Sequence, residues 1–192
     1  MKTAFSIRSA LIVFAMFLSA CSYKNEPIYL QPYQANAIVP ILKEKKTLHI
    51  RAVNDQRVQK QTIGYVLEND NKKIILSSNE HFAKKYHDAL TYALSVAEFN
   101  THVSPQDAQL IVDVNIKNIE LQGFDKNFDE NLKGEIAVEL VVTQKSTITR
   151  YNLASKAGKW IAPSRSSKDL EPFLSELFED SIQAVVTQLA KK

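Results

Sequence analysis

The stretch "AQLIVDVNIKNIEL" occupies residues 108–121, and apolar and polar side chains alternate along most of its length. A period of two places successive side chains on opposite faces of a β-strand, so this stretch predicts a long strand with one apolar face and one wet face. The apolar set is Leu110, Val112, Val114 and Ile116, and the polar set is Asp113, Asn115 and Lys117.

Two later stretches repeat this pattern. In "NLKGEIAVELVVTQ", residues 131–144, apolar positions alternate with Lys133, Glu135, Glu139 and Thr143. A third strand is predicted in "TITRYNLASKAGKW", residues 147–160, after a turn at Lys145-Ser146. Three consecutive strands of this kind predict an antiparallel meander with one covered face and one solvated face.

Three shorter strands are predicted ahead of the meander. In "LHIRAV", residues 48–53, the alternation places Leu48, Ile50 and Ala52 on the buried side. The stretches "TIGYVLE", residues 62–68, and "KKIILSS", residues 72–78, flank Asn69-Asp70-Asn71. Asn and Asp tolerate the left-handed backbone of a tight turn, so these two stretches predict a hairpin.

Two amphipathic helices are predicted, one before the meander and one after it. Ser77 and Glu80 have capping-box spacing and predict the start of the first helix, which should end before Asn100. Its apolar stripe is Phe82, Tyr86, Leu90, Ala93, Leu94 and Ala97. The second helix is predicted in the run of apolar and acidic residues near the C-terminus. Pro172 lacks an amide hydrogen and suits a first turn, so this helix should begin close to Pro172.

These elements predict an α+β fold. Two amphipathic helices and one half-wet sheet bury their apolar faces most simply as two layers, with both helices packed on one face of an antiparallel or mixed sheet. The predicted globular part, residues 47–192, is the length of a single domain. The order of the strands within the sheet stays open at this stage.

The N-terminus resembles a bacterial lipoprotein signal. Residues 1–20 hold two cations, no acid and an apolar run about half the ~20 residues that span a bilayer. The segment Leu18-Ser19-Ala20-Cys21 is similar to a lipobox, which implies cleavage before Cys21 and acylation of its thiol and new amine. Ser22 replaces the Asp that favours inner-membrane retention, so the resemblance implies the outer membrane, facing the periplasm. The alternative is a plain exported protein with an incidental cysteine.

Residues 21–46 are predicted to be a lipidated N-terminus and tether. They carry three prolines, three tyrosines and no sustained helical or strand period. A flexible coil of this length would reach about 25–30 Å. The favoured alternative is a linker partly docked on its own domain, with its tyrosines against the domain or at the lipid interface.

Composition argues against several classes of function. Removal of Lys2 and Arg8 with the signal reduces the 24 cations to 22 against 21 acids, a net charge of +1, so we expect no nucleic-acid partner. Acylation of the single cysteine would leave no thiol for a metal site or a nucleophile. The four histidines lack a chelating spacing, and we expect no metal, cofactor or catalytic residues.

Three residues are candidates for contact with a partner. Asp55 and Arg57 lie in the polar run after the first strand, where they could form a recognition corner. The favoured alternative is a turn in which Asp55 caps backbone amides and pairs with Arg57. Trp160 is the single tryptophan, a residue type enriched in binding hot spots, although a core or rim position is the favoured interpretation.

The chain resembles the YajG-like family of uncharacterised envelope lipoproteins. The resemblance rests on the lipobox around Cys21, "VNDQR" at residues 53–57, "ITRYNLASKAGKW" at residues 148–160, and the final acidic and apolar helix. It implies an envelope location and transfers no catalytic residue. Small envelope lipoproteins that serve lipid transporters have a similar element order.

Three functions follow, in order of preference. The first is a non-catalytic, membrane-anchored lipoprotein that acts as an interaction or structural module in the periplasm, with an unknown envelope protein or cell-wall partner. The alternative is a lipid- or ligand-binding accessory subunit of an envelope transport system, with a pocket between sheet and helices. The least favoured is a hydrolase with a site assembled from scattered residues.

Overall fold

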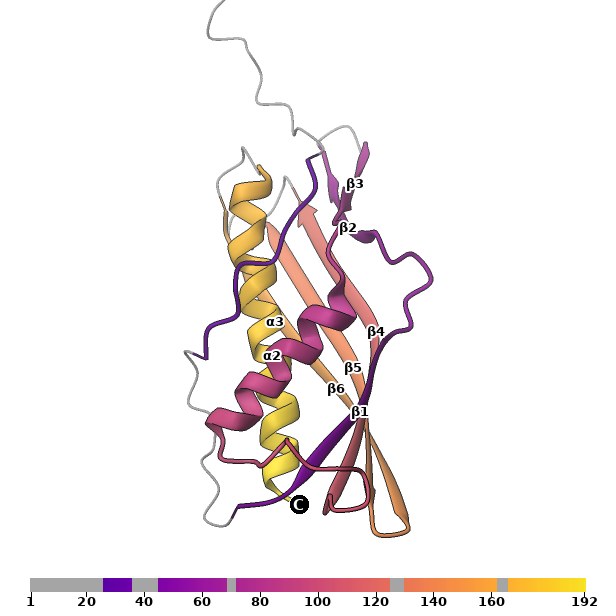
Figure 1. The fold of residues 1–192 in the computed structure, drawn as a ribbon. Coiled ribbons are helices and arrows are strands. Elements are labelled where there is room, and N and C mark those ends of the chain that lie inside the picture. The colour runs from indigo at the N-terminus through magenta and orange to yellow at the C-terminus, as the bar shows by residue number, and fades with distance from the viewer. Residues whose placement is uncertain (1–25, 36–44, 69–71, 125–129, 162–165) are drawn as a thin grey trace, which may run out of the picture.

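The computed structural model describes residues 26–35, 45–68, 72–124, 130–161 and 166–192. Along the chain come three short strands, a helix, three long strands and a second helix. The six strands form one mixed sheet, and the two helices cover one of its faces (Figure 1). The predicted α+β fold is therefore confirmed. Within the described part of the chain, no helix combines the length and apolar character needed to cross a membrane.

The three long strands form the predicted meander. They are β4 (Leu110–Phe124), β5 (Leu132–Gln144) and β6 (Thr147–Lys159), and each adjacent pair is antiparallel. Strand β6 forms one edge of the sheet, and its burial pattern shows no fully buried residue.

The other edge of β4 is shared by two strands. Strand β1 (Leu48–Asp55) runs parallel to the first half of β4, and β2 (Thr62–Leu67) runs parallel to its end. Strand β3 (Lys73–Ser77) pairs antiparallel with β2 and completes the predicted hairpin. The sheet order is β3-β2-β4-β5-β6, with β1 alongside β4. The predicted turn at residues 69–71 lies outside the described residues, as do residues 125–129 in the link between β4 and β5.

Two irregularities change which side chains face the core. The register of β4 shifts between Ile116 and Asn118, so the next buried apolar residue is Ile119. In β1 the register shifts between Ile50 and Ala52. Ala52 consequently pairs with Asp113 of the wet face, and Val53 packs against the core instead. The prediction that Ala52 faces the core was therefore wrong, because an extra residue in a strand reverses the alternation beyond it.

Neither helix begins at the residue predicted for it. Helix α2 (Phe82–Val96) follows His81 and has no side-chain cap, so the predicted capping box at Ser77 is wrong. Ser77 ends β3, and the Glu80 carboxylate accepts a hydrogen bond from Leu30 N–H. Helix α3 (Ser167–Ala190) begins well before Pro172, contrary to prediction. Its capping box joins Ser166 and Asp169, and the Ser166 N–H lies 2.9 Å from Asp169 Oδ2.

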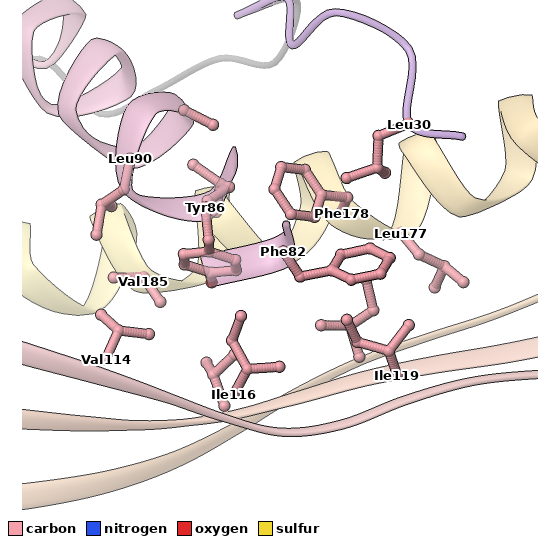
Figure 2. Packing of buried hydrophobic residues seen from close by; sticks show 14 of the residues in the cluster. Leu30, Phe82, Tyr86, Leu90, Val114, Ile116, Ile119, Leu177, Phe178 and Val185 are labelled. Carbon is pink, nitrogen blue, oxygen red and sulfur yellow. The ribbon is translucent and has the colours of Figure 1, made fainter. Parts of the chain in front are cut away.

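The core lies between the sheet and the helices (Figure 2). All six residues of the predicted stripe are buried, five of them on helix α2 and Ala97 directly after it. The rings of Tyr86 and Phe178 meet edge to face with centroids 5.4 Å apart. The buried hydroxyl of Tyr86 lies 2.9 Å from Ser181 Oγ, so the polar end of this ring has a partner inside the core.

Residues 26–35, here called the strap, pack across the two helices (Figure 1). Ile28 is fully buried and Leu30 is 7% exposed. The Ile28 N–H donates to the Ser77 carbonyl oxygen at 2.9 Å, and the Gln31 N–H donates to Ser175 Oγ at 2.9 Å. The described part of the predicted tether is thus docked on the domain, and the reach of a flexible coil does not apply to it. Residues 1–25 and 36–44 lie outside the described residues.

Candidate functional site

Asp55 and Arg57 lie at the corner between β1 and β2. Arg57 Nε and Nη2 donate to the two oxygens of Asp55 at 2.9 and 2.7 Å. The same guanidinium donates to the carbonyl oxygens of Lys60 and Thr62 at 2.8 and 3.3 Å. The pair therefore holds together the six residues by which the chain leaves the β4 edge and returns to it.

This ion pair is buried. The side chains of Arg57 and Asp55 are 5% and 10% exposed. Burial alone would raise the pKa of Asp55, but hydrogen bonds and charge from Arg57 outweigh it, and the pKa lies below its ordinary value. The contacts are those of the turn that the alternative interpretation described. A role for the pair in partner recognition stays a prediction.

Trp160 lies elsewhere in the molecule. It follows the end of β6, is 54% exposed, and precedes Ile161, whose backbone exchanges two hydrogen bonds with the Asn131 side chain. Strands β4 and β5 separate β6 from β1, so Trp160 and the Asp55–Arg57 corner do not form one site. Cys21 lies outside the described residues.

The sheet face opposite the helices, here called the outer face, carries a ladder of paired polar residues. Arg51 donates to both carboxylate oxygens of Asp113 across the β1–β4 pair. Farther along, Glu139 accepts from Asn115 Nδ2 at 2.9 Å and lies 3.4 Å from Lys117 Nζ. The hydrogen bond from Asn115, and then the charge of Lys117, hold the pKa of Glu139 below its ordinary value.

A hollow of about 340 Å³ opens on the outer face near the other end of this ladder. Its carboxylates come from Glu120, Glu130 and Glu135, and its ammonium groups come from Lys133 and Lys156. Lys156 Nζ lies 3.3 Å from Glu135, and Lys133 Nζ lies 3.8 Å from Glu130. The hollow therefore presents both signs of charge to whatever enters it.

Gly158 shapes this hollow. A Cβ atom at this position would lie 2.5 Å from the carboxyl carbon of Glu130, closer than two such atoms can approach. The absence of a side chain on β6 thus lets the Glu130 carboxylate lie over the strand. The described lining holds no hydroxyl, imidazole or thiol group. Its half-exposed ion pairs suit contact with a polar or zwitterionic group on the surface of a partner.

A second cavity, of about 280 Å³, lies between the strap and α2. Its lining includes the apolar residues Leu30, Pro32, Ala89 and Phe178, together with the charged residues Lys85 and Asp88. Tyr33 meets Tyr92 edge to face beside it with ring centroids 6.2 Å apart. Burial raises the pKa of Tyr33 to about 12, and the charge of Glu179 acts in the same direction. This groove can hold a short apolar chain.

The sequence pattern predicted two of the five charged residues that line the outer hollow. The alternation in β5 marked Lys133 and Glu135 as wet-face residues. Their neighbours depend on the register, which pairs Glu135 with Glu120 on one side and with Lys156 on the other. The Glu130–Gly158 approach leaves no sequence signal, because the link that ends at residue 130 shows no period. Over the described residues, no group of three metal-ligating side chains occurs.

Comparison with solved structures identifies proteins with a similar fold. One protein, described as uncharacterised, matches with a TM-score of 0.52 at 10% identity, over 86% of this chain and 99% of its own. A DUF330 protein from Xanthomonas campestris matches with a TM-score of 0.50 at 9% identity, over 88% of this chain and 92% of its own. The fold is shared with uncharacterised bacterial proteins. At these identities the likeness extends to the fold alone.

Sequence comparison adds no closer relative. No family model matches the chain, and no curated protein matches it. The resemblance to the YajG-like lipoproteins therefore rests on the sequence stretches that suggested it, and it stays a prediction.

Proposed function

We propose that this protein is a non-catalytic lipoprotein of the bacterial envelope. Acyl chains on Cys21 would anchor it, at the outer membrane facing the periplasm, and its α+β domain would bind an envelope protein or a cell-wall component through the outer face. The observation that carries the proposal is the outer face, which neither helix covers, with its 340 Å³ hollow of paired carboxylates and lysines.

The two faces of the sheet differ, and the difference supports the outer face as the docking surface. Helices α2 and α3 cover one face and bury the apolar side chains there (Figure 2). On the outer face Lys133 and Lys156 keep side chains that are 53% and 66% exposed, and each pairs with a glutamate. Such a surface offers matched charges to a polar partner, which favours specific docking more than general adhesion.

In-cell photo-crosslinking tests the docking surface. A photoreactive residue in place of Lys156, in the outer hollow, should give a discrete adduct with an envelope component. The same residue in place of Lys84, an exposed position on α2 whose side chain is 78% exposed, should not. Lys133→Glu should weaken the adduct from position 156. Equal adducts from both positions, or monomer alone from both, would contradict the proposed docking face.

The anchor has a separate test. The parent protein should incorporate labelled palmitate and fractionate with membranes, whereas Cys21→Ala should do neither. A parent protein that takes up no label and stays in the periplasmic extract would contradict the lipid anchor without bearing on the outer face.

A second candidate is a lipid- or ligand-binding accessory subunit. It is favoured by the apolar groove of about 280 Å³ beneath the strap. Native mass spectrometry should then detect co-purified lipid, and Ala89→Trp should displace it by filling the groove, whereas Lys84→Trp on the same helix should not. A spectrum free of lipid for the unaltered protein would count against this candidate.

A further inference from the structure

The strap begins only five residues after the proposed anchor. Cys21 and Glu26 are separated by five peptide steps, and Glu26 already contacts the domain at Ser167. We infer that the domain is held against its own membrane in a fixed orientation, with one defined end facing the lipid. This inference rests on the proposed acylation of Cys21 and adds to it the geometry of attachment.

Chain length limits the gap between lipid and domain. Five residues span at most about 18 Å when fully extended. Helix α3, with its 24 residues, is about 36 Å long. The link is therefore shorter than the domain, and it keeps the first turn of α3 close to the bilayer, whereas it lets the far end of the helix extend away from the lipid.

Hydrogen bonds along the strap keep its start in place. Glu26 Oε2 accepts from the Ser167 hydroxyl at 3.4 Å, at the first turn of α3. The N–H groups of Tyr29 and Leu30 donate to the carboxylates of Glu171 and Glu80, each at 3.2 Å. These bonds, with the buried side chains of Ile28 and Leu30, tie the strap to α3 and to the segment before α2.

The end next to Glu26, here called the proximal end, is defined by several elements. It holds the first turn of α3, the ends of β2, β4 and β6, and the start of β3 (Figure 1). The register supports this grouping, because Leu67 pairs with Phe124, and Leu132 pairs with both Gly123 and Lys159. The C-terminus lies at the opposite end of the molecule (Figure 1).

The exposed side chains at the proximal end suit a lipid surface. Trp160 is 54% exposed there, and indole rings favour the boundary between headgroups and acyl chains. Lys168 is exposed on the first turn of α3, and the side chains of Lys72 and Lys159 are 65% and 51% exposed. These lysines can contact lipid phosphates. Glu68 and Glu176 pair with two of them, so the short link, more than net charge, sets the orientation.

Energy transfer in vesicles tests the orientation. The mature, acylated full chain is reconstituted in phosphatidylethanolamine–phosphatidylglycerol vesicles that contain a headgroup-labelled acceptor lipid. With Cys21 acylated, Lys168→Cys or Lys191→Cys provides a single thiol for the donor dye. Both positions are exposed, and about 35 Å of α3 separates them. We expect several-fold stronger transfer from position 168, whereas equal transfer, or stronger transfer from position 191, would overturn the orientation.

Two further measurements separate the possible failures. Vesicle flotation reads attachment alone: a protein that does not float overturns the anchor and the orientation together, whereas one that floats with equal transfer overturns only the orientation. A flexible insert of about 20 Gly and Ser residues between Asn25 and Glu26 lengthens the link. It should leave flotation unchanged and bring the two transfer values together. An unchanged difference in this variant would show that the short link does not orient the domain.

Discussion

The guanidinium of Arg57 lies against the ring of Phe82, with its central carbon 4.8 Å from the ring centroid, while it donates to both oxygens of Asp55. One side chain thereby joins the end of β1 to the first residue of α2. The corner is needed because β1 and β2 share one edge of β4 and the chain must step away between them. The polar run that suggested a recognition surface holds the sheet edge together.

The corner should be sensitive to loss of either charge. Arg57→Met or Asp55→Asn leaves the other charge buried without its partner, so each should lower the free energy of unfolding by about 3–5 kcal/mol. Urea denaturation followed by circular dichroism measures this change. The double variant should be less destabilised than the sum of the two single variants. Losses below about 1 kcal/mol in both single variants would contradict a structural role.

The contribution of the Asp55–Arg57 ion pair to stability should also depend on pH. Folding lowers the pKa of Asp55, so its contribution to stability is complete above the unfolded pKa of about 3.9 and is lost as the pH falls through the lower folded value. The stability gap between the unaltered protein and Asp55→Asn should be widest at pH 7 and should narrow below about pH 4. A gap that stays constant down to pH 2 would exclude this origin.

The hydroxyl of Tyr86 should contribute to core stability through Ser181. Both side chains are buried, and their oxygens lie 2.9 Å apart. Tyr86→Phe removes this partner from Ser181 and should cost about 1–3 kcal/mol, and Ser181→Ala in the same chain should recover part of the loss. Tyr92→Phe serves as the control, because Tyr92 is 53% exposed and its loss should stay within about 0.5 kcal/mol.

The strap should behave as part of the core. Ile28→Ala removes a fully buried side chain and should cost about 2–5 kcal/mol in urea denaturation of the mature chain. Tyr29→Ala changes the neighbouring residue, which is 47% exposed, and should cost clearly less. A loss for Ile28→Ala as small as that for an exposed residue would mean that the strap does not stay docked in solution.

Glu179 should destabilise the domain at neutral pH. Burial raises its pKa, the hydrogen bond from the Gln34 backbone opposes the shift, and the charges of Asp180 and Glu176 add to it. A carboxyl group whose pKa rises on folding weakens the fold at every pH above its unfolded pKa, about 4.3. Glu179→Gln should therefore raise Tm at pH 7, and the gain should shrink as the pH falls and vanish below about pH 4. A lower Tm at pH 7 would contradict this.

Much of the fold was predictable because its signals are local. Period-two alternation marked β4 and β5, and the helical stripe from Phe82 to Ala97 marked α2. These patterns survive in the structure because one face of each element is buried against the other layer. Their number and order led to the two-layer α+β architecture.

The rest depends on contacts between distant residues. The shift beside Lys117 lies where β4 changes from pairing with β1 to pairing with β2, and the sequence of β4 does not reveal this change of partner. The start of α2 was misplaced because Glu80 bonds to the strap instead of forming a local cap. In the candidate site, Lys133 and Glu135 followed from alternation, whereas Glu120 and Lys156 became their neighbours only through the register.

The charges on strand β6 affect whether two copies of the protein can pair edge to edge. Its far edge is unpaired in the described sheet, and lipid-anchored copies would be concentrated in two dimensions. The strand carries Arg150, Lys156 and Lys159 and no acid. If two copies paired antiparallel about Leu153, Arg150 of each would face Lys156 of the other, and such like-charge pairs are unfavourable. The basic rim of the sheet would therefore keep two neighbouring copies from pairing edge to edge through β6.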